Sequence, residues 1–198
     1  MASNRATKSG FAAEAADKIS KKYDEGEAQQ ALEWLKGILS DNGMEGPTNT
    51  SGSQDNVYEQ LKDGLYLSRL ANVLHPGCVN SSKLQTAQKL AFKQMEMINI
   101  FLAKAVEFGV PATESFQTVD LFERTNLHQV ILCLSSTARK AKAKGMRGYG
   151  PKESEANIRN FSEEQLKAGQ NVIGLQMGSN KGATQAGQNF GKGRMIMD

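Results

Sequence analysis

The chain has 198 residues, 39% of them hydrophobic, and a formal charge of only +3. This length allows one ordinary hydrophobic core with extensions, and the small charge does not indicate nucleic-acid binding. No apolar run approaches the roughly 18 residues of a membrane span, and the N-terminus lacks the apolar run of a signal peptide. We therefore expect a cytoplasmic protein without nucleic-acid or membrane partners, in which Cys78 and Cys133 are reduced.

Helical periodicity begins near the N-terminus. We expect a short helix at residues 11–23 and a longer amphipathic helix at 27–40, with Trp34 at the edge of its apolar face. The apolar residues of that face recur at helical spacing: Ala28, Ala31, Leu32, Leu35, Ile38 and Leu39. A polar, glycine-containing stretch at 41–56 is expected to form a loop.

Further helices are predicted at residues 57–61, 65–74 and 92–108, the last ending at Gly109. The predicted buried face of the long helix contains Phe92, Met95, Ile98, Phe101, Leu102 and Ala105. Another helix begins at Asn126 as its cap, with Gln129 completing a capping box. Its predicted buried residues are Leu127, Val130, Ile131, Leu134 and Ala138. No stretch alternates like a strand, so the fold class is all-α.

The composition changes after Lys144, where glycine, proline and charge replace apolar periodicity. We interpret residues 145–168 as a linker. A short helix is predicted inside it, because Ser162 and Gln165 form a capping-box pattern and Phe161 can contact Leu166. Basic residues also gather around the preceding helix end and form either a binding patch or a solvated helix terminus: Arg139, Lys140, Lys142, Lys144 and Arg147.

The sequence contains no convincing catalytic, cofactor or metal site. GQNFGKG at 187–193 has the wrong spacing for a phosphate loop, and a calcium loop starting at Asp41 would have glycines at ligand positions three and twelve. His128 and Cys133 are five residues apart and point in different directions on a helix, which argues against a nucleophile pair or a metal pair. We expect a protein that is not an enzyme and has no cofactor or metal.

Two motifs resemble those of one family. The run Asp55-Asn56-Val57-Tyr58, the run Leu61-Lys62-Asp63-Gly64 and the following Leu67, Leu70, Asn72 and His75-Pro76-Gly77 resemble the signature of a calponin-homology domain. FKQMEMINIFLAKAVEFGVP is similar to its long core helix, and VIGLQMGSNKGATQAGQNFGKGRMI is similar to a calponin-like repeat. One domain with one repeat resembles the calponin and transgelin family.

The resemblance implies four segments. They are an N-terminal extension with a short helix (1–24), a calponin-homology domain (25–144), a linker with a short helix (145–168) and a calponin-like repeat (169–198). It also implies a cytoskeletal, non-enzymatic protein that binds F-actin and bundles or stabilises it in muscle or contractile cells. The alternative is a signalling adaptor that uses the calponin-homology domain to bind other proteins.

Two departures from the family pattern shape the expected actin contact. The chain has one repeat where calponins have several, so it lacks the avidity of linked sites. A lone calponin-homology domain is also weak evidence for actin binding in this family. We therefore expect the main contact in the repeat, where extended backbone would place Ile173, Leu175 and Met177 on one side.

Polar residues of the repeat complete the predicted actin contact. Lys181, Lys192 and Arg194 would face the acidic surface of actin, and hydrogen bonds would come from Asn180, Gln185 and Gln188. The other interpretation is that the three apolar residues cover the helical domain of the same chain. Two hydroxyl residues beside Lys181, Ser179 and Thr184, are candidate phosphorylation sites, and Thr184 matches a segment that resembles a regulatory site of the family.

Overall fold

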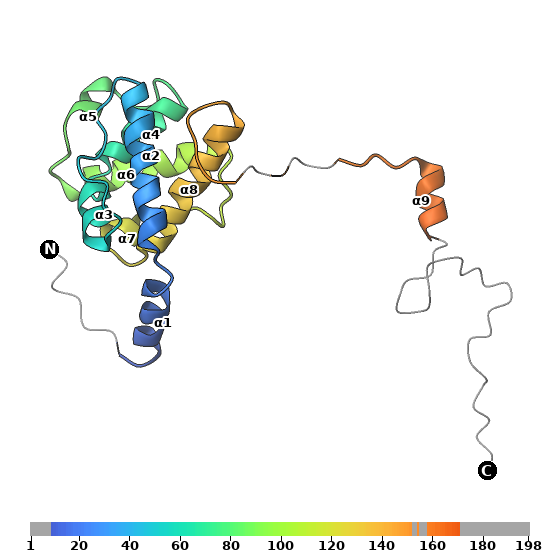
Figure 1. Cartoon of the computed structure of the whole chain (residues 1–198), viewed down its shortest axis with the longest axis horizontal. Helices are drawn as coiled ribbons and strands as arrows, with labels where there is room; N and C mark the ends of the chain where they lie inside the picture. Colours follow the sequence, from blue (N-terminus) through green and yellow to red (C-terminus); the bar gives the residue numbers. More distant parts are fainter. Residues whose placement is uncertain (1–8, 152–153, 155–157, 171–198) are drawn as a thin grey trace, which may run out of the picture. The chain divides into compact units, whose positions relative to one another are not determined.

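A computed structural model describes residues 9–151, 154 and 158–170 of the chain (Figure 1). All regular structure in these residues is helical, which confirms the predicted fold class. Two units are distinguished, Met1–Ser154 with helices α1 to α8 and Glu155–Asp198 with α9. The helices of the first unit are α1 (Phe11–Ser20), α2 (Glu25–Asp41), α3 (Gln54–Leu61), α4 (Leu65–Leu74), α5 (Ser81–Gln85), α6 (Ala91–Phe108), α7 (Thr118–Phe122) and α8 (Leu127–Ala143).

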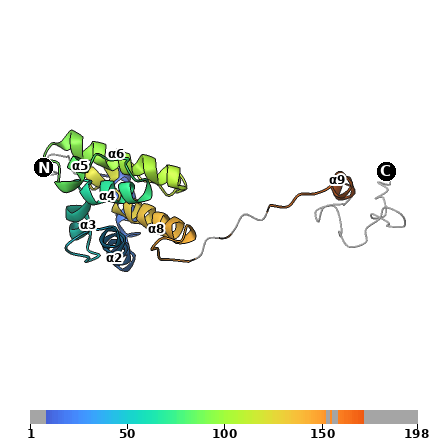
Figure 2. The ribbon, with the colours of Figure 1, turned by 90° about the horizontal axis from the view of Figure 1, so that it is seen from above.

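Four helices, α2, α4, α6 and α8, form the framework of the domain. α4 packs along α6, and α2 packs on both α4 and α8. In the view of Figure 2, α6 forms one outer edge of the domain, while α2 and α8 lie toward the opposite edge. The shorter α3 packs on α2, α4 and α8, and α7 packs on α6 and α8.

Side-chain caps fix where the helices begin. Oδ1 of Asp24 accepts hydrogen bonds from the backbone N–H groups of Gly26 (2.7 Å) and Glu27 (3.0 Å) at the start of α2. Oδ1 of Asn126 accepts one from the N–H of Gln129 (3.2 Å), as predicted for α8. The predicted capping box at α8 is wrong, because the Gln129 amide donates instead to the carbonyl groups of Thr113 and Ser115.

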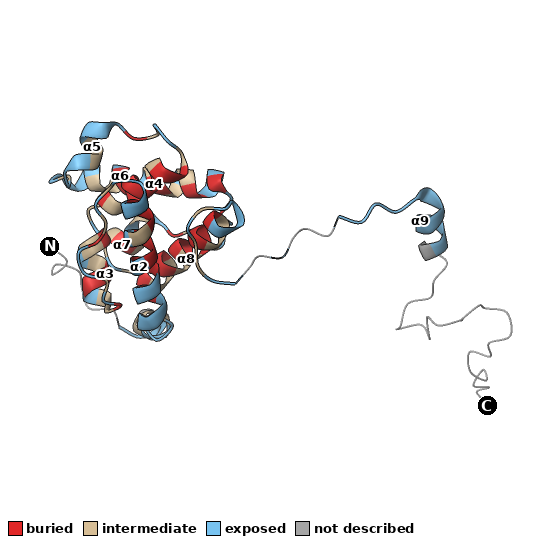
Figure 3. Ribbon diagram, turned by 45° about the horizontal axis from the view of Figure 1, so that its top comes forward, coloured by how far each residue is buried: buried red, intermediate tan, exposed pale blue. Residues whose placement is uncertain are grey.

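The core contains the apolar faces predicted for α2 and α8, shown as red ribbon in Figure 3. All six residues predicted for the face of α2 are buried, and Trp34, placed at the edge, is only 4% exposed. The five residues predicted for α8 are buried as well. Because each of these two helices has one apolar face, the sequence pattern was sufficient to predict which of its sides is buried.

The predicted buried face of α6 is partly wrong. Ile98, Phe101 and Ala105 are fully buried, but Phe92 is 64% exposed, and Met95 and Leu102 are only half-buried. α6 carries apolar residues on two sides, and the core takes the side that also includes Met97 and Phe108.

Two short helices, α5 and α7, were not predicted, because five residues are too few for a periodic pattern. The short helix predicted after Ser162 is present as α9 (Glu163–Gln170). Its capping box is confirmed, since Ser162 Oγ accepts from the N–H of Gln165 (3.3 Å) and Gln165 Oε1 accepts from that of Ser162 (3.0 Å). Phe161 and Leu166 remain more than half exposed.

Truncation of either fully buried side chain, by Leu35→Ala or Phe101→Ala, should lower the free energy of unfolding by about 2 to 5 kcal/mol through lost burial and a residual cavity. Thermal or denaturant unfolding measures this effect. Phe92→Ala is the matched control, because it removes the same ring from an exposed position of the same helix. Equal losses from Phe92→Ala and Phe101→Ala would contradict the assignment of the buried face.

Candidate functional site

The basic residues predicted as a second patch lie at the C-terminal end of α8 and just beyond it. Arg139 pairs with Glu114 at 2.7 Å, and Arg147 pairs with Asp41 at 3.2 Å. Lys144 Nζ donates to the carbonyl group of Phe108 (2.8 Å) and lies 3.6 Å from the centroid of that ring. These cations hold parts of the domain together, so their charge is partly neutralised within the chain.

The segment after α8, residues 145–150, returns along α2 and α8. The indole N–H of Trp34 donates to the carbonyl group of Arg147 (2.7 Å), and the hydroxyl groups of Tyr149 and Ser135 share a hydrogen bond of 2.7 Å. Lys142 Nζ donates to the carbonyl group of Gly150 (2.8 Å). The expected linker thus begins with residues that pack on the domain.

Glycine allows this segment to approach α8. A Cβ atom on Gly148 would lie 2.3 Å from the carbonyl oxygen of Ala138 and 2.6 Å from Cβ of Lys142. On α2, a Cβ atom at Gly37 would lie 2.5 Å from the guanidinium carbon of Arg147. Gly148, which in the sequence belongs to a stretch of linker composition, is therefore required by close packing.

Gly148→Ala should displace the segment, lower the free energy of unfolding by about 1 to 3 kcal/mol and shift the fluorescence of Trp34. The shift is expected because the indole loses its hydrogen bond to Arg147. Gly77→Ala is the control, since its φ of +83° gives backbone strain but no atom lies within 4 Å of the new Cβ. An unchanged emission spectrum in Gly148→Ala would mean that the segment does not depend on this contact.

Arg69 on α4 is a buried charge that sequence reasoning missed. It is only 6% exposed, and its guanidinium donates to the carbonyl groups of Glu45 (2.6 Å) and Leu84 (2.7 Å). These bonds tie the loop after α2 and the end of α5 to α4. An arginine inside the apolar pattern of a helix is the sequence signal for such an anchor, because buried charges need several partners.

The polar residues of the predicted domain signature stabilise turns. Nδ2 of Asn56 donates to the carbonyl groups of Asn49 (3.2 Å) and Ser51 (2.7 Å), and Oδ1 of Asn72 accepts from the N–H of Gly77 (3.0 Å). Oδ1 of Asp63 accepts from the N–H of Leu65 (3.0 Å) at the start of α4. These three residues of the motif therefore have structural roles in the domain.

Burial raises the pKa of Asp63, with backbone hydrogen bonding to Leu65 opposing the shift. A carboxyl group with a raised folded-state pKa favours folding most below its unfolded pKa, and this contribution is lost as the pH rises through the folded pKa. The carboxyl group of Asp63 therefore keeps its hydrogen bond to Leu65, although burial disfavours its charged form.

The histidines and cysteines do not assemble into a reactive or metal-binding group. No cluster of three or more metal-ligating side chains of His, Cys, Asp or Glu occurs among the described residues. Burial raises the pKa of the Cys133 thiol to about 12, which keeps it protonated and unreactive at neutral pH. Cys78 also has a raised pKa, mainly from burial. None of the helices in residues 9–151 and 158–170 is long and apolar enough to cross a membrane.

Shallow hollows occur on the described surface, but none gathers catalytic groups. One of about 250 Å³ lies between α1 and the start of α8, beside Asp17, Arg124 and His128. Arg124 is already paired with Asp55 and lies 5.7 Å from the ring centroid of Tyr58. The one arginine that lines the hollow therefore already has a structural role, and the lining residues form no assembled acid–base pair.

The predicted actin-contact residues lie outside the described residues, as do the two candidate phosphorylation sites. They are Ile173, Leu175, Met177, Ser179, Asn180, Lys181, Thr184, Gln185, Gln188, Lys192 and Arg194. Their predicted roles remain predictions from the sequence.

Comparison with known proteins agrees with the helical domain and with the C-terminal motif. Residues 25–143 match the family model of the calponin homology (CH) domain, and residues 173–196 match that of the calponin family repeat. The chain belongs to the calponin family. This membership supports a cytoskeletal, actin-associated role and indicates no catalytic family.

A full-length relative and two solved structures resemble the chain. Myophilin from Echinococcus granulosus is 40% identical over 200 residues, covering 99% of this chain and 100% of that protein. The calponin-homology domain of RNG2 from Schizosaccharomyces pombe is 22% identical with a TM-score of 0.52 and covers 76% of this chain and 88% of that one. The domain of an IQGAP protein from the same organism is 21% identical with a TM-score of 0.51 and the same coverage. The two structures support the fold.

Proposed function

We propose that the chain binds actin filaments through its C-terminal repeat and bundles or stabilises them in the cytoplasm of muscle or contractile cells. The observation that carries this proposal is the match of residues 173–196 to the calponin family repeat, in one chain with a calponin homology domain. The predicted contact residues from Ile173 to Arg194 all fall within the matched range.

The repeat has the chemistry for a shallow contact with an acidic filament. Ile173, Leu175 and Met177 would enter an apolar groove, and glycines between and after them permit close backbone approach. Lys181, Lys192 and Arg194 would then approach carboxylates of actin, with Asn180 donating hydrogen bonds. The basic residues around the end of α8 are weaker candidates, because most of them already bind groups of their own domain.

Lys181→Glu should weaken binding to F-actin by about two- to tenfold, because an exposed charge pair contributes about 0.2 to 1 kcal/mol and reversal adds repulsion. Cosedimentation across a range of actin concentrations measures the change. Lys167→Glu is the matched control, since it reverses an exposed charge on α9 outside the repeat. Raising the salt concentration should reduce wild-type binding, because a Debye length of about 10 Å at 0.1 M screens such pairs.

A second version of the assay tests the repeat as a whole. A chain ending at Ser154 keeps the segment that packs on Trp34 and removes the second unit, so its domain should unfold at nearly the wild-type temperature. It should lose most binding to F-actin. Full retention of binding would move the contact to the helical domain and would favour the adaptor-like use of that domain.

Stoichiometric phosphorylation of Thr184 should weaken binding to F-actin. It adds a charge of about −1.5 to −2 three residues from Lys181, next to a surface that must approach acidic actin. Pelleting of the phosphorylated protein measures the shift, with phosphorylated Thr184→Ala protein as the control for modification elsewhere, including Ser179. A binding curve that does not move would discard this regulation and leave the actin contact intact.

A further inference from the structure

The loop after α2 begins with an Asn-Gly pair, Asn42-Gly43, and no other asparagine of the sequence precedes a glycine. Asparagine is thermolabile, because the backbone nitrogen of the next residue can attack its side-chain amide. A following glycine favours this attack, since no Cβ atom shields the nitrogen. Both residues are exposed, and no atom lies within 4 Å of the position that a Cβ atom on Gly43 would take.

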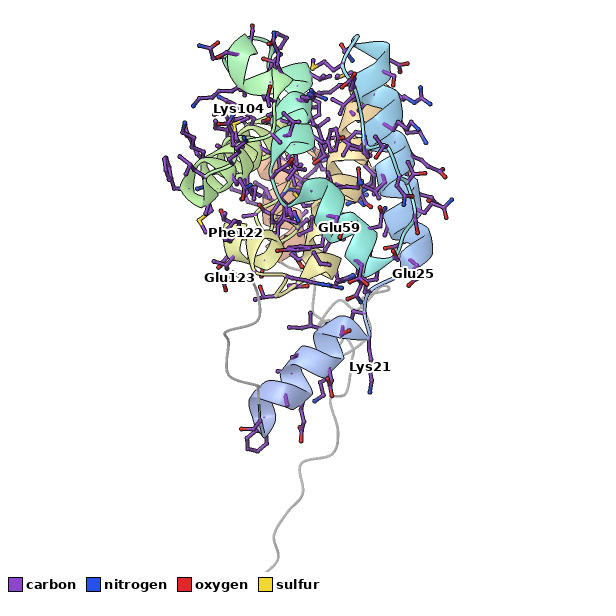
Figure 4. All side chains as sticks on the ribbon, turned by 90° about the vertical axis from the view of Figure 1, so that its left-hand side faces the viewer. Lys21, Glu25, Glu59, Lys104, Phe122 and Glu123 are labelled. Carbon is purple, nitrogen blue, oxygen red and sulfur yellow. The ribbon has the colours of Figure 1, made fainter. Side chains whose placement is uncertain are left out.

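The pair lies in the turn that ends α2. The N–H of Met44 donates to the carbonyl group of Leu39 (2.9 Å), and the N–H of Gly43 donates to that of Ser40 (3.0 Å), which is the pattern of a Schellman motif. Gly43 has the left-handed conformation that the motif needs, with a φ of +71°. Figure 4 shows α2 running from its labelled first residue, Glu25, to the end of the domain away from α1, so the turn lies at that end.

Hydrogen bonds of the folded turn engage both reacting groups. Asn42 Nδ2 donates to the carbonyl group of Ile38 (2.8 Å), and the N–H of Gly43 is bonded to Ser40. The attack requires the Gly43 nitrogen to lose its proton and to face Cγ of Asn42, so both bonds must break first. The end of a helix opens at a lower free energy than the whole domain unfolds. Local opening of this turn therefore gives the reaction its route.

We propose that Asn42 is a site of spontaneous deamidation, in which water is the reactant and opening of the last turn of α2 limits the rate. The Gly43 nitrogen forms a bond to Cγ of Asn42 while the bond from Cγ to Nδ2 breaks, and the proton of Gly43 leaves with the side-chain nitrogen as ammonia. Water then adds to one of the two carbonyl groups of the succinimide ring. Addition at one carbonyl gives aspartate and addition at the other gives isoaspartate, without oxidation or reduction.

The aspartate product is unfavourable at the end of α2. A carboxylate cannot donate to the carbonyl group of Ile38, so the side-chain hydrogen bond of Asn42 is lost. Negative charge is also unfavourable at the C-terminal end of a helix dipole. The preceding residue, Asp41, already carries the charge that pairs with Arg147 at 3.2 Å. Deamidation should therefore loosen the end of this helix.

The isoaspartate product also changes the backbone, because the chain then runs through Cβ and gains a carbon atom. The loop is closely fixed just after this point. A Cβ atom on Gly46 would lie 2.7 Å from Cα of Lys36, and the carbonyl group of Glu45 accepts a hydrogen bond from Arg69 (2.6 Å). A longer backbone at Asn42 should displace these contacts. Arg69 is only 6% exposed, so its buried charge would lose one of its partners.

Incubation of the full chain at mildly alkaline pH, followed by tryptic peptide mapping, tests the site. Asn42 and Asn49 fall in one tryptic peptide, residues 37–62, so the same spectra report both. Both residues are exposed, but Asn49 precedes Thr50. Asn42 should deamidate at least about tenfold faster than Asn49, which corresponds to about 1.4 kcal/mol or more in activation free energy. A smaller difference, or no mass change at Asn42, would overturn the proposal.

Two variants and urea test whether opening limits the rate. Met44→Ala removes a half-buried side chain that packs against the core at the end of the turn, and it should speed the reaction at Asn42. Met95→Ala is the matched control, since it makes the same change at a half-buried position of α6. The wild-type chain unfolded in urea should react faster than the folded chain. Equal rates in folded and unfolded protein, or in the two variants, would reject control by opening.

Thermal unfolding of the separated products tests the structural consequence. Asn42→Asp supplies the aspartate form and should lower the thermal midpoint by about 2 to 4 °C, and the isoaspartate form isolated from aged protein should unfold at a lower temperature still. Asn49→Asp is the control, because Oδ1 of Asn49 accepts from the N–H of Ser51 (2.9 Å), which a carboxylate also does. An isoaspartate form with the wild-type midpoint would contradict the displacement of the loop.

Discussion

The helical domain depends on the burial of one face of α6. Ile98, Phe101 and Ala105 have no exposed surface, and α4 packs along them. This close approach needs the turn at Gly64, where φ is +71° and a Cβ atom would lie 2.9 Å from Cβ of Met97. Since α4 and α8 both contact α6, moving it would open the part of the core that these three helices share.

Around this core, side chains of arginine, lysine and asparagine donate hydrogen bonds to backbone carbonyl groups of loops and helix ends. Arg69 does so for the loop after α2 and the end of α5, Asn56 for the loop before α3, and Lys144 for the end of α6. Carbonyl groups without helical partners need donors, and long side chains can reach several of them. Several charged residues therefore stabilise the fold of this domain. For that reason, the cluster of basic residues at the end of α8 is weaker evidence for a ligand-binding site.

How far the sequence predicted the fold depended on how many sides of each helix are apolar. α2 and α8 have one apolar face, so periodicity identified their buried residues. α6 has two, and periodicity cannot tell which one the core takes, so Phe92 was assigned wrongly. Residues 145–150 have linker composition, yet Gly148 is required by contact with Ala138, a residue ten positions earlier that only the fold brings close. The predicted contact residues of the repeat rest on sequence alone.

A single repeat limits what the proposed actin contact can do. One weak contact dissociates readily, whereas linked contacts gain affinity because the second binds at a high effective concentration. The calponin family repeat matches residues 173–196 once, and a chain with one filament contact cannot connect two filaments by itself. Bundling by this chain would therefore require a second filament contact, either elsewhere in the same chain or on an associated copy of it.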